Sequence, residues 1–191
     1  MEMKKLLLAI ITLCFSLSAM RVTAQTNVIK TFAGSSPVGK PVLSLGGSVY
    51  DAVLDKKGNL YLSGLYNRIW KLSPNGSIAL YAGNGPNSYS GDNGPATAAG
   101  LYGPGKINID GNGNVYFMDN GNYVIRKIDT NGIITTIAGN GIKPSFGYYS
   151  ADNVPATSES LNESLGIAID SYGNVYFSDG FRIHKININD T

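Results

Sequence analysis

Short apolar, β-branched and aromatic runs alternate with polar clusters rich in Gly, Asn and Asp along most of the chain. Segment 107–141 shows this pattern most clearly. Its apolar runs predict four strands at 107–109, 114–119, 123–129 and 133–139. Because Gly and Asn accept the positive φ that tight turns require, the intervening clusters predict antiparallel hairpins. One such four-stranded sheet has apolar residues on both faces and therefore needs neighbouring sheets.

The same pattern recurs along the chain, which predicts tandem repeats of one small sheet. The anchor Gly-Asn-[Leu/Val]-Tyr occurs at 58–61, 113–116 and 173–176, and Asp55, Asp110 and Asp170 each precede it by three residues. A strand with the core Ile-x-Lys-[Leu/Ile] follows at 69–72, 125–128 and 183–186. A fourth strand ending in Ala-Gly follows at 78–83 and 134–139, with an earlier copy at 29–34.

Long connections join each Ala-Gly strand to the next repeat. Segment 91–97 reads GDNGPAT and leads to Leu101, and segment 151–157 reads ADNVPAT and leads to Leu161. The first connection, 35–48, lacks this motif. The variable parts of the two later connections lie directly before the motif.

Taken together, AGNG, SGDNGPATAAGL, GNVYFMD, IRKID and TTIAGNG resemble NHL-repeat β-propeller blades, as in secreted bacterial NHL proteins and the NHL domain of teneurins. The resemblance covers about 27–188. It implies an all-β, NHL-type β-propeller, a family that usually has six blades and serves as a binding surface. The strand before the Gly-Asn anchor would be innermost and the Ala-Gly strand outermost. We expect a propeller domain at 25–191, with repeats at about 35–83, 84–139 and 140–191.

The predicted strands make up about three four-stranded blades, which would form an open arc with exposed apolar faces, whereas closed propellers use four to eight blades. Two explanations stay open. The chain could be part of a longer protein. Alternatively, two copies could associate head to tail as a homodimer, with 27–34 of one copy supplying the outer strand of the other's last blade.

Composition agrees with a turn-rich all-β protein, since the 191 residues include 24 Gly and 12 Tyr and only 15% are charged.

Segment 1–24 has a different character: Lys4 and Lys5 precede an apolar run at 6–20, and Val22 and Ala24 suit a signal peptidase. A membrane anchor is the alternative, but the run is short for a span. We therefore predict a signal peptide and a secreted, periplasmic or extracellular protein without a membrane span after cleavage.

Signal cleavage changes the chemistry that is available. It would remove Cys14, the only cysteine, which leaves no disulfide or thiol chemistry. It would also remove three basic residues and one acidic residue, so the mature chain would carry balanced charge. We therefore expect no nucleic-acid partner.

His184 is the only histidine, which excludes a histidine-rich metal site within one chain. It takes the position of Trp70 and Arg126 in the other repeats, so a structural role is expected. The peptide-amidating lyases among NHL relatives use several histidines, and this chain lacks them.

Segment 110–114 weakly resembles a calcium loop, but its copies lack the middle ligand. A β-turn capped by the Asp side chain fits better. Asp119 and Asp179, at the ends of second strands, are expected to fix the next hairpin.

The connections carry the candidate ligand-binding residues, because such loops surround the channel mouth in propellers. The candidates are Tyr89, Asp92, Asn93, Tyr148, Tyr149, Asp152 and Asn153. Carboxylate, amide and tyrosine side chains suit hydrogen bonding and stacking on a sugar or peptide. The alternative is that Asp92 and Asp152 cap the turn of Pro-Ala-Thr, while Ala98, Leu101 and Leu161 fill the gap between blades.

The sequence thus favours a secreted binding or scaffold module for an extracellular protein or glycan, with no catalytic residues, no cofactor and no metal. The alternative is a metal-dependent propeller enzyme, similar to lactonases or lyases, which would need carboxylates from several blades. Calorimetric titration with calcium, zinc and magnesium separates the two hypotheses.

Overall fold

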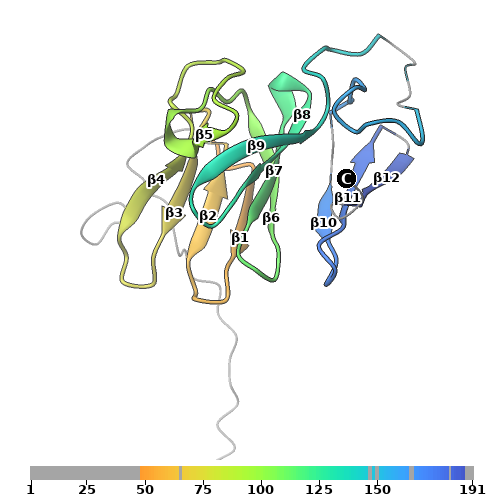
Figure 1. The fold of residues 1–191 in the computed structure, drawn as a ribbon. Helices are drawn as coiled ribbons and strands as arrows, with labels where there is room; N and C mark the ends of the chain where they lie inside the picture. Colours follow the sequence, from red (N-terminus) through yellow and green to blue (C-terminus); the bar gives the residue numbers. More distant parts are fainter. Residues whose placement is uncertain are drawn as a thin grey trace, which may run out of the picture. The chain divides into compact units, whose positions relative to one another are not determined.

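The computed structural model describes residues 48–64, 66–145, 148, 151–163, 166–180 and 182–187, all within one compact unit that spans 33–191 (Figure 1). The predicted signal peptide, the predicted strand at 29–34 and the connection at 35–47 lie outside the described residues. No helix among the described residues has the length and apolar character needed to cross a bilayer.

Three antiparallel sheets follow one another along the chain. The first sheet has the order β1 (Asp51–Leu54), β2 (Leu60–Ser63), β3 (Ile69–Leu72) and β4 (Ile78–Ala82). The second sheet contains β6 (Pro104–Ile109), β7 (Val115–Asp119), β8 (Val124–Ile128) and β9 (Ile133–Ala138), and β5 (Gly94–Pro95) pairs with the outer side of β9. The third sheet contains β10 (Ile167–Ile169), β11 (Val175–Asp179) and β12 (Arg182–Ile186).

The all-β prediction is confirmed, and the four strands expected in segment 107–141 are present as β6 to β9. Two 3₁₀ turns, η1 (Ala96–Ala98) and η2 (Asn120–Asn122), are the only helical elements that the structure describes. Strand β5 was not predicted, because Gly94 and Pro95 carry no β-propensity. Its pairing comes from the position of the connection against β9.

The turn before each Gly-Asn anchor is held by its aspartate. Asp110 Oδ1 accepts hydrogen bonds from the backbone N–H groups of Asn112 and Asn114, both at 2.9 Å. Its Oδ2 accepts from the Asn114 side-chain amide at 2.7 Å and from the Tyr116 hydroxyl at 3.2 Å. Burial tends to raise the pKa of Asp110, but these hydrogen bonds hold it below its usual value. The prediction of an aspartate-capped turn is confirmed.

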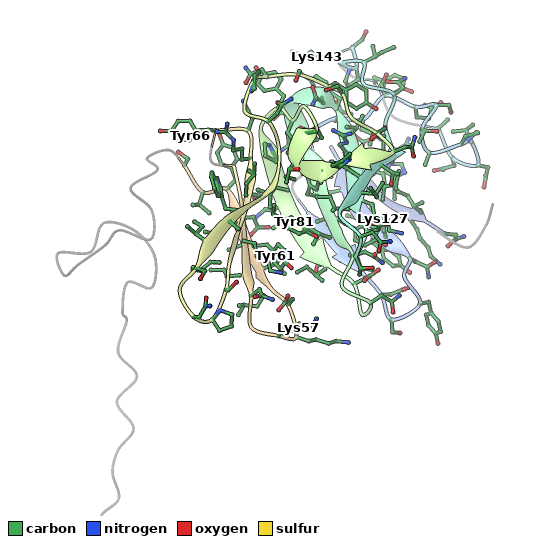
Figure 2. The ribbon with its side chains drawn as sticks, turned by 60° about the vertical axis from the view of Figure 1, so that its left-hand side comes forward. Lys57, Tyr61, Tyr66, Tyr81, Lys127 and Lys143 are labelled. Carbon is green, nitrogen blue, oxygen red and sulfur yellow. The ribbon has the colours of Figure 1, made fainter. Side chains whose placement is uncertain are left out.

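The other two sheets repeat this arrangement, at Asp55, Asn59 and Tyr61 and at Asp170, Asn174 and Tyr176. A lysine of the next strand lies over each tyrosine ring, and the three are Lys71, Lys127 and Lys185. We call this end of the sheets the turn end. The opposite end, which carries the β2–β3 and β7–β8 hairpins and the connections that contain the Asp92 and Asp152 motifs, is the loop end. Figure 2 shows Lys57 at the turn end and Tyr66 and Lys143 at the loop end.

Glycine is required where each outer strand passes the preceding hairpin at the loop end. Gly83 and Gly139 have φ values of +94° and +87°. A Cβ on Gly139 would lie 2.3 Å from the carbonyl oxygen of Tyr123, and one on Gly83 would lie 2.3 Å from that of Asn67. The Ala-Gly ending therefore reflects both the left-handed conformation and the close backbone contact.

The apolar core lies between adjacent sheets. Residues of the first and second sheets form one cluster that includes Tyr61, Ile69, Leu101, Ile107 and Phe117. Residues of the second and third sheets form another, with Met118, Ile125, Ala138, Leu161 and Phe177. The expected roles of Leu101 and Leu161 are confirmed. The expectation for Ala98 was wrong: Ala98 is exposed, and Ala96 and Ala99 are buried instead.

Candidate functional site

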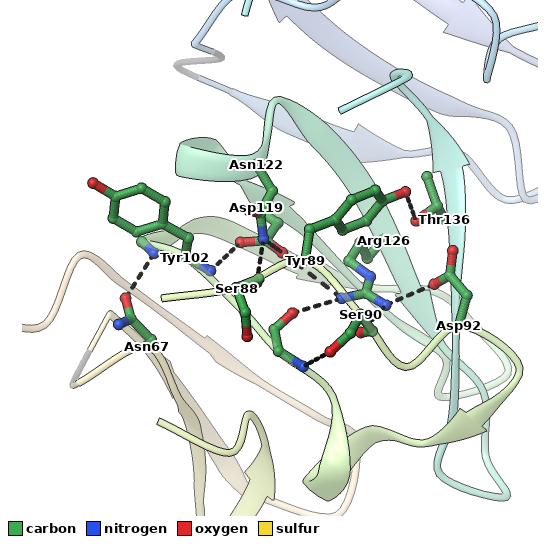
Figure 3. Close-up of polar contacts among 12 residues, drawn as sticks. Asn67, Ser88, Tyr89, Ser90, Asp92, Tyr102, Asp119, Asn122, Arg126 and Thr136 are labelled. Atoms are coloured by element: carbon green, nitrogen blue, oxygen red, sulfur yellow. Dashed lines mark hydrogen bonds and ion pairs between the residues drawn. The ribbon is translucent and has the colours of Figure 1, made fainter. Parts of the chain in front are cut away.

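The connection between β4 and β6, residues 83–103, is anchored to the second sheet by Arg126. We call it the Asp92 connection. Arg126 lies in β8, and its side chain has no exposed surface. One guanidinium nitrogen donates to Asp92 at 2.6 Å and to the Ser90 carbonyl at 3.1 Å, and the other donates to the Gly100 carbonyl at 3.1 Å (Figure 3). A single buried cation thus fixes both arms of the connection.

Asp119 is the second acidic partner of Arg126, at 3.8 Å, and it is fully buried at the end of β7. It accepts hydrogen bonds from the Tyr102 backbone N–H at 2.7 Å and from the Asn122 side chain at 2.8 Å. Burial raises the pKa of Asp119 to about 6, although these hydrogen bonds and Arg126 oppose the rise. Asp119 therefore bonds within its own hairpin, as predicted, and also holds the end of the Asp92 connection.

Tyr89 covers the outer side of Arg126. Its ring centroid lies 5.5 Å from the guanidinium carbon, and its hydroxyl is 3.0 Å from the Thr136 hydroxyl in β9. Asn93 acts through its backbone: it has φ of +63°, and its N–H donates to the Ile134 carbonyl at 2.7 Å. The structure therefore brings Tyr89 and Asp92 together through Arg126 and places Asn93 in a neighbouring turn.

The connection between β9 and β10, which we call the Asp152 connection, is built differently. Its aspartate has 77% of its side chain exposed and lies 4.0 Å from His184 Nδ1. The Tyr148 hydroxyl donates to Glu159, and Asn153 has φ of +61°. Asp152, Asn153, Glu159 and His184 line a cavity of about 430 Å³. Tyr149 and Phe146 lie outside the described residues.

The position of the Asp92 connection differs from the position expected for a loop at a channel mouth. Its β5 pairs with β9, and its aspartate contacts β8, so this part lies against the third and outer strands rather than the inner strand β6. The alternative role of Asp92 as a cap of the Pro-Ala-Thr turn was wrong as well, because its carboxylate accepts from Arg126. Sequence reasoning missed Arg126 as the anchor, although the Trp70, Arg126 and His184 alignment was visible.

Exposed tyrosines gather at the loop end of the first two sheets. Tyr50 precedes β1, Tyr66 lies in the β2–β3 hairpin and Tyr102 precedes β6, with exposed fractions of 58%, 54% and 45%. The Asn67 side chain links two of these segments, because it accepts from the Gly103 N–H at 2.9 Å and donates to the Gly85 carbonyl at 3.1 Å. Its αL backbone, with φ of +56°, sets the direction of the hairpin.

Among the described residues, no three His, Cys, Asp or Glu side chains lie close enough together to bind one metal ion. Several acidic groups there have other partners: the turn aspartates bond to their own turns, and Asp119 and Asp92 contact Arg126.

Known proteins share this sequence pattern and fold. The family described as Teneurin NHL domain matches residues 42–146, more than half of the chain. Teneurin-3 of Danio rerio is 46% identical over 63 residues, which cover 33% of this chain and 2% of that protein. Human teneurin-1 is 33% identical over 104 residues, 53% of this chain and 4% of that protein. The chain thus spans a small fraction of these relatives.

Solved structures show the same fold at low sequence identity. A Bacteroides thetaiotaomicron protein of unknown function matches with a TM-score of 0.61 and 22% identity over 75% of this chain and 37% of that one. An auxiliary nutrient binding protein from Bacteroides ovatus matches with a TM-score of 0.54 and 23% identity, over 71% of this chain and 36% of that one. A streptogramin B lyase matches with a TM-score of 0.52 and 19% identity, over 78% of this chain and 41% of that one. With the repeated sheets and the family match, these results show that the chain belongs to the teneurin NHL domain family and has the NHL-repeat β-propeller fold, represented by partial blades.

Proposed function

We propose that this chain is an extracellular binding module whose loop end docks a protein or glycan. The observation that carries the proposal is the group of exposed tyrosines at that end, Tyr50, Tyr66 and Tyr102. Tyrosine combines a large apolar surface with a hydroxyl and loses little conformational entropy on binding, so it is enriched at interfaces.

The surroundings of these tyrosines suit a binding surface. Asn67 and Asp119 accept hydrogen bonds from the backbone N–H groups of Gly103 and Tyr102, at the end of the Asp92 connection. The backbone that carries the tyrosine rings is therefore held in a fixed position. Pre-organised aromatic groups bind with a smaller ordering cost than groups on a loose loop. We retain Tyr89, Asp92 and Asn93, together with Tyr148, Tyr149, Asp152 and Asn153, as proposed ligand contacts. An extracellular location and a head-to-tail homodimer remain predictions as well.

A binding screen tests the proposal. The full chain is applied to an array of glycans and purified extracellular protein domains, and hits are measured by surface plasmon resonance. The double variant Tyr66→Ser, Tyr102→Ser should weaken a hit at least tenfold, because it removes two large contact surfaces.

Tyr172 provides the matched control. It is 80% exposed and lies in the turn 170–174, at the opposite end of the third sheet. Tyr172→Ser should bind as the wild type does. The proposal is wrong if the wild-type chain binds none of the probes, or if the Tyr172 variant loses as much affinity as the double variant.

A further inference from the structure

A second cavity lies at the turn end, between the first and second sheets, and its volume is about 360 Å³. The first sheet contributes Asp55, Lys56, Lys57, Tyr61, Lys71 and Tyr81. The second sheet contributes the turn 109–113 and Thr130. Figure 2 shows Tyr61 and Tyr81 side by side, with Lys57 at the turn below them. A cavity of this size can enclose one or two sugar rings.

The carboxylates in this cavity already have partners. Asp55 accepts from the backbone N–H groups of Lys57 and Asn59, from the Asn59 side chain and from the Tyr61 hydroxyl. Burial tends to raise the pKa of Asp55, but these hydrogen bonds lower it below its usual value. Asp110 is bonded in the same way. Both carboxylates therefore serve their turns and are not available to a ligand.

The lysines, in contrast, are not neutralised by carboxylates. None of Lys56, Lys57 and Lys71 forms an ion pair within the described residues. Lys56 donates to the Gly111 carbonyl at 2.9 Å, and Lys71 lies 5.4 Å from the centre of the Tyr61 ring. Each ammonium group retains N–H donors, and the three lysines outnumber the two carboxylates among the lining residues, so the cavity carries a small net positive charge.

Two tyrosine rings form the inner wall. Tyr61 and Tyr81 meet edge to face with centroids 4.8 Å apart. The Tyr81 hydroxyl makes no hydrogen bond to any described residue, although the ring is half-buried. Burial, followed by the nearby charges of Tyr61, Asp129 and Asp55, raises the pKa of Tyr81, so the hydroxyl is a neutral donor and acceptor at physiological pH.

The internal repeats show that these residues are not needed to build a sheet. Lys56 and Lys57 correspond to Gly111 and Asn112 in the second sheet, and to Ser171 and Tyr172 in the third. Tyr81 is the bulge residue of the β3–β4 pair, where the β8–β9 pair has Ile137. The same turn and the same bulge form without them. The features specific to the first sheet thus converge on one cavity, which points to a ligand rather than to folding.

From these observations we propose that the turn-end cavity binds an acidic saccharide unit, that is, a sugar ring carrying a carboxylate or a sulfate. The lysines contact the anionic group, the half-buried Tyr81 ring covers the apolar face of the sugar, and Asn112, Thr130 and the Tyr81 hydroxyl bond its hydroxyl groups. A sugar fits better than an acidic peptide, because the cavity is small and lined by aromatic rings. This site is separate from the loop-end surface.

Isothermal titration of the full chain tests the proposal with four probes: a digalacturonate, a sulfated disaccharide, neutral cellobiose and hexaglutamate. We expect the digalacturonate or the sulfated disaccharide to bind, with affinity that falls as salt rises, and cellobiose and hexaglutamate to bind at least tenfold more weakly. Which of the two acidic sugars binds identifies the anionic group. No binding by either acidic sugar at millimolar concentration overturns the proposal, as does equal binding of cellobiose or hexaglutamate.

Variants taken from the next repeat locate the site. Lys57→Asn and Tyr81→Ile introduce the residues that the second sheet tolerates at the same positions, so folding should be retained. Each should weaken acidic-sugar binding at least fivefold. Lys143→Gln, which removes an exposed charge at the loop end, should leave it unchanged. An equal loss of acidic-sugar affinity in the Lys143 variant, or no loss in the Lys57 and Tyr81 variants, contradicts the assignment. The Tyr66 and Tyr102 double variant should retain this binding, so failure here and failure of the loop-end function are distinguishable.

Discussion

The Asp92 and Asp152 connections share one motif but have different supports. In the second sheet, Arg126 extends from β8 and reaches the aspartate at 2.6 Å, and the carboxylate is 34% exposed. In the third sheet, the shorter His184 takes the same register position opposite Phe177, and its aspartate is 4.0 Å away and mostly exposed. A recurring loop motif can therefore be tightly fixed in one repeat and border an open cavity in the next, depending on one residue of the third strand.

Loss of Arg126 should have the largest effect. Arg126→Ala leaves Asp119 as a buried charge and leaves the Ser90 and Gly100 carbonyls without their donor. We expect the free energy of unfolding to fall by about 3–5 kcal/mol in urea denaturation. His184→Ala, the matched change in the third sheet, removes the stacking on Phe177 and the contact with the buried Asp179 at 3.7 Å. It should cost less than about 2 kcal/mol, because among the described residues the histidine makes no charge-assisted bond as short as that of Arg126. Equal losses would contradict the difference between the two connections.

The pH dependence of stability should report on Asp119. A folded-state pKa of about 6 lies above the value of about 3.9 expected for an unfolded chain. As the pH rises from 4 to 6, the unfolded state releases its proton first, so this group lowers the free energy of unfolding by up to about 3 kcal/mol. Below pH 4 both states are protonated and the penalty is absent.

Asp119→Asn tests this expectation, because the amide oxygen can still accept from the Tyr102 N–H. The variant should lack the decline between pH 4 and 6 when urea denaturation is repeated at several pH values. Asp55, Asp110 and Asp170 act in the opposite direction, since their lowered pKa values give stability that is lost only as the pH falls below about 4. If wild type and variant give parallel curves above pH 4, Asp119 titrates normally.

Single removals of the two motif aspartates should differ by a smaller amount. Asp92→Ala breaks a charge-assisted hydrogen bond to a buried guanidinium and should cost about 1–2 kcal/mol. Asp152→Ala affects an exposed side chain and should change stability by no more than about 0.5 kcal/mol. Thermal unfolding of both variants provides the measurement, and a larger loss for Asp152→Ala is the result that this account does not allow.

The sequence predicted the parts of the structure that depend on local pattern. Strand alternation, the Gly-Asn anchors and the turn aspartates repeat at fixed spacing, and each is explained by contacts within a few residues of Asp55, Asp110 or Asp170. The structural equivalence of Trp70, Arg126 and His184 also followed from the alignment, and their partners Leu62, Phe117 and Phe177 in the sheets confirm it.

Contacts between segments that lie far apart in the sequence could not be predicted from the sequence pattern. Arg126 meets Asp92 across 34 positions, and β5 pairs with β9 although Gly94 and Pro95 give no strand signal. Ala98 was chosen over Ala96 and Ala99 because alanine spacing alone does not show which side of η1 faces the core. The turn-end cavity did leave a signal, since Lys56, Lys57 and Tyr81 are among the positions at which the first repeat departs from the second.

A pair of double-mutant cycles tests the central claim most directly, that the third-strand residue decides whether the connection is fixed. One cycle combines Asp92→Ala with Arg126→Ala, and the other combines Asp152→Ala with His184→Ala, with free energies of unfolding from urea denaturation. We predict a coupling energy of at least about 1.5 kcal/mol for the first pair and less than about 0.5 kcal/mol for the second. Coupling of equal size in both sheets, or the larger value for Asp152 and His184, would contradict the account.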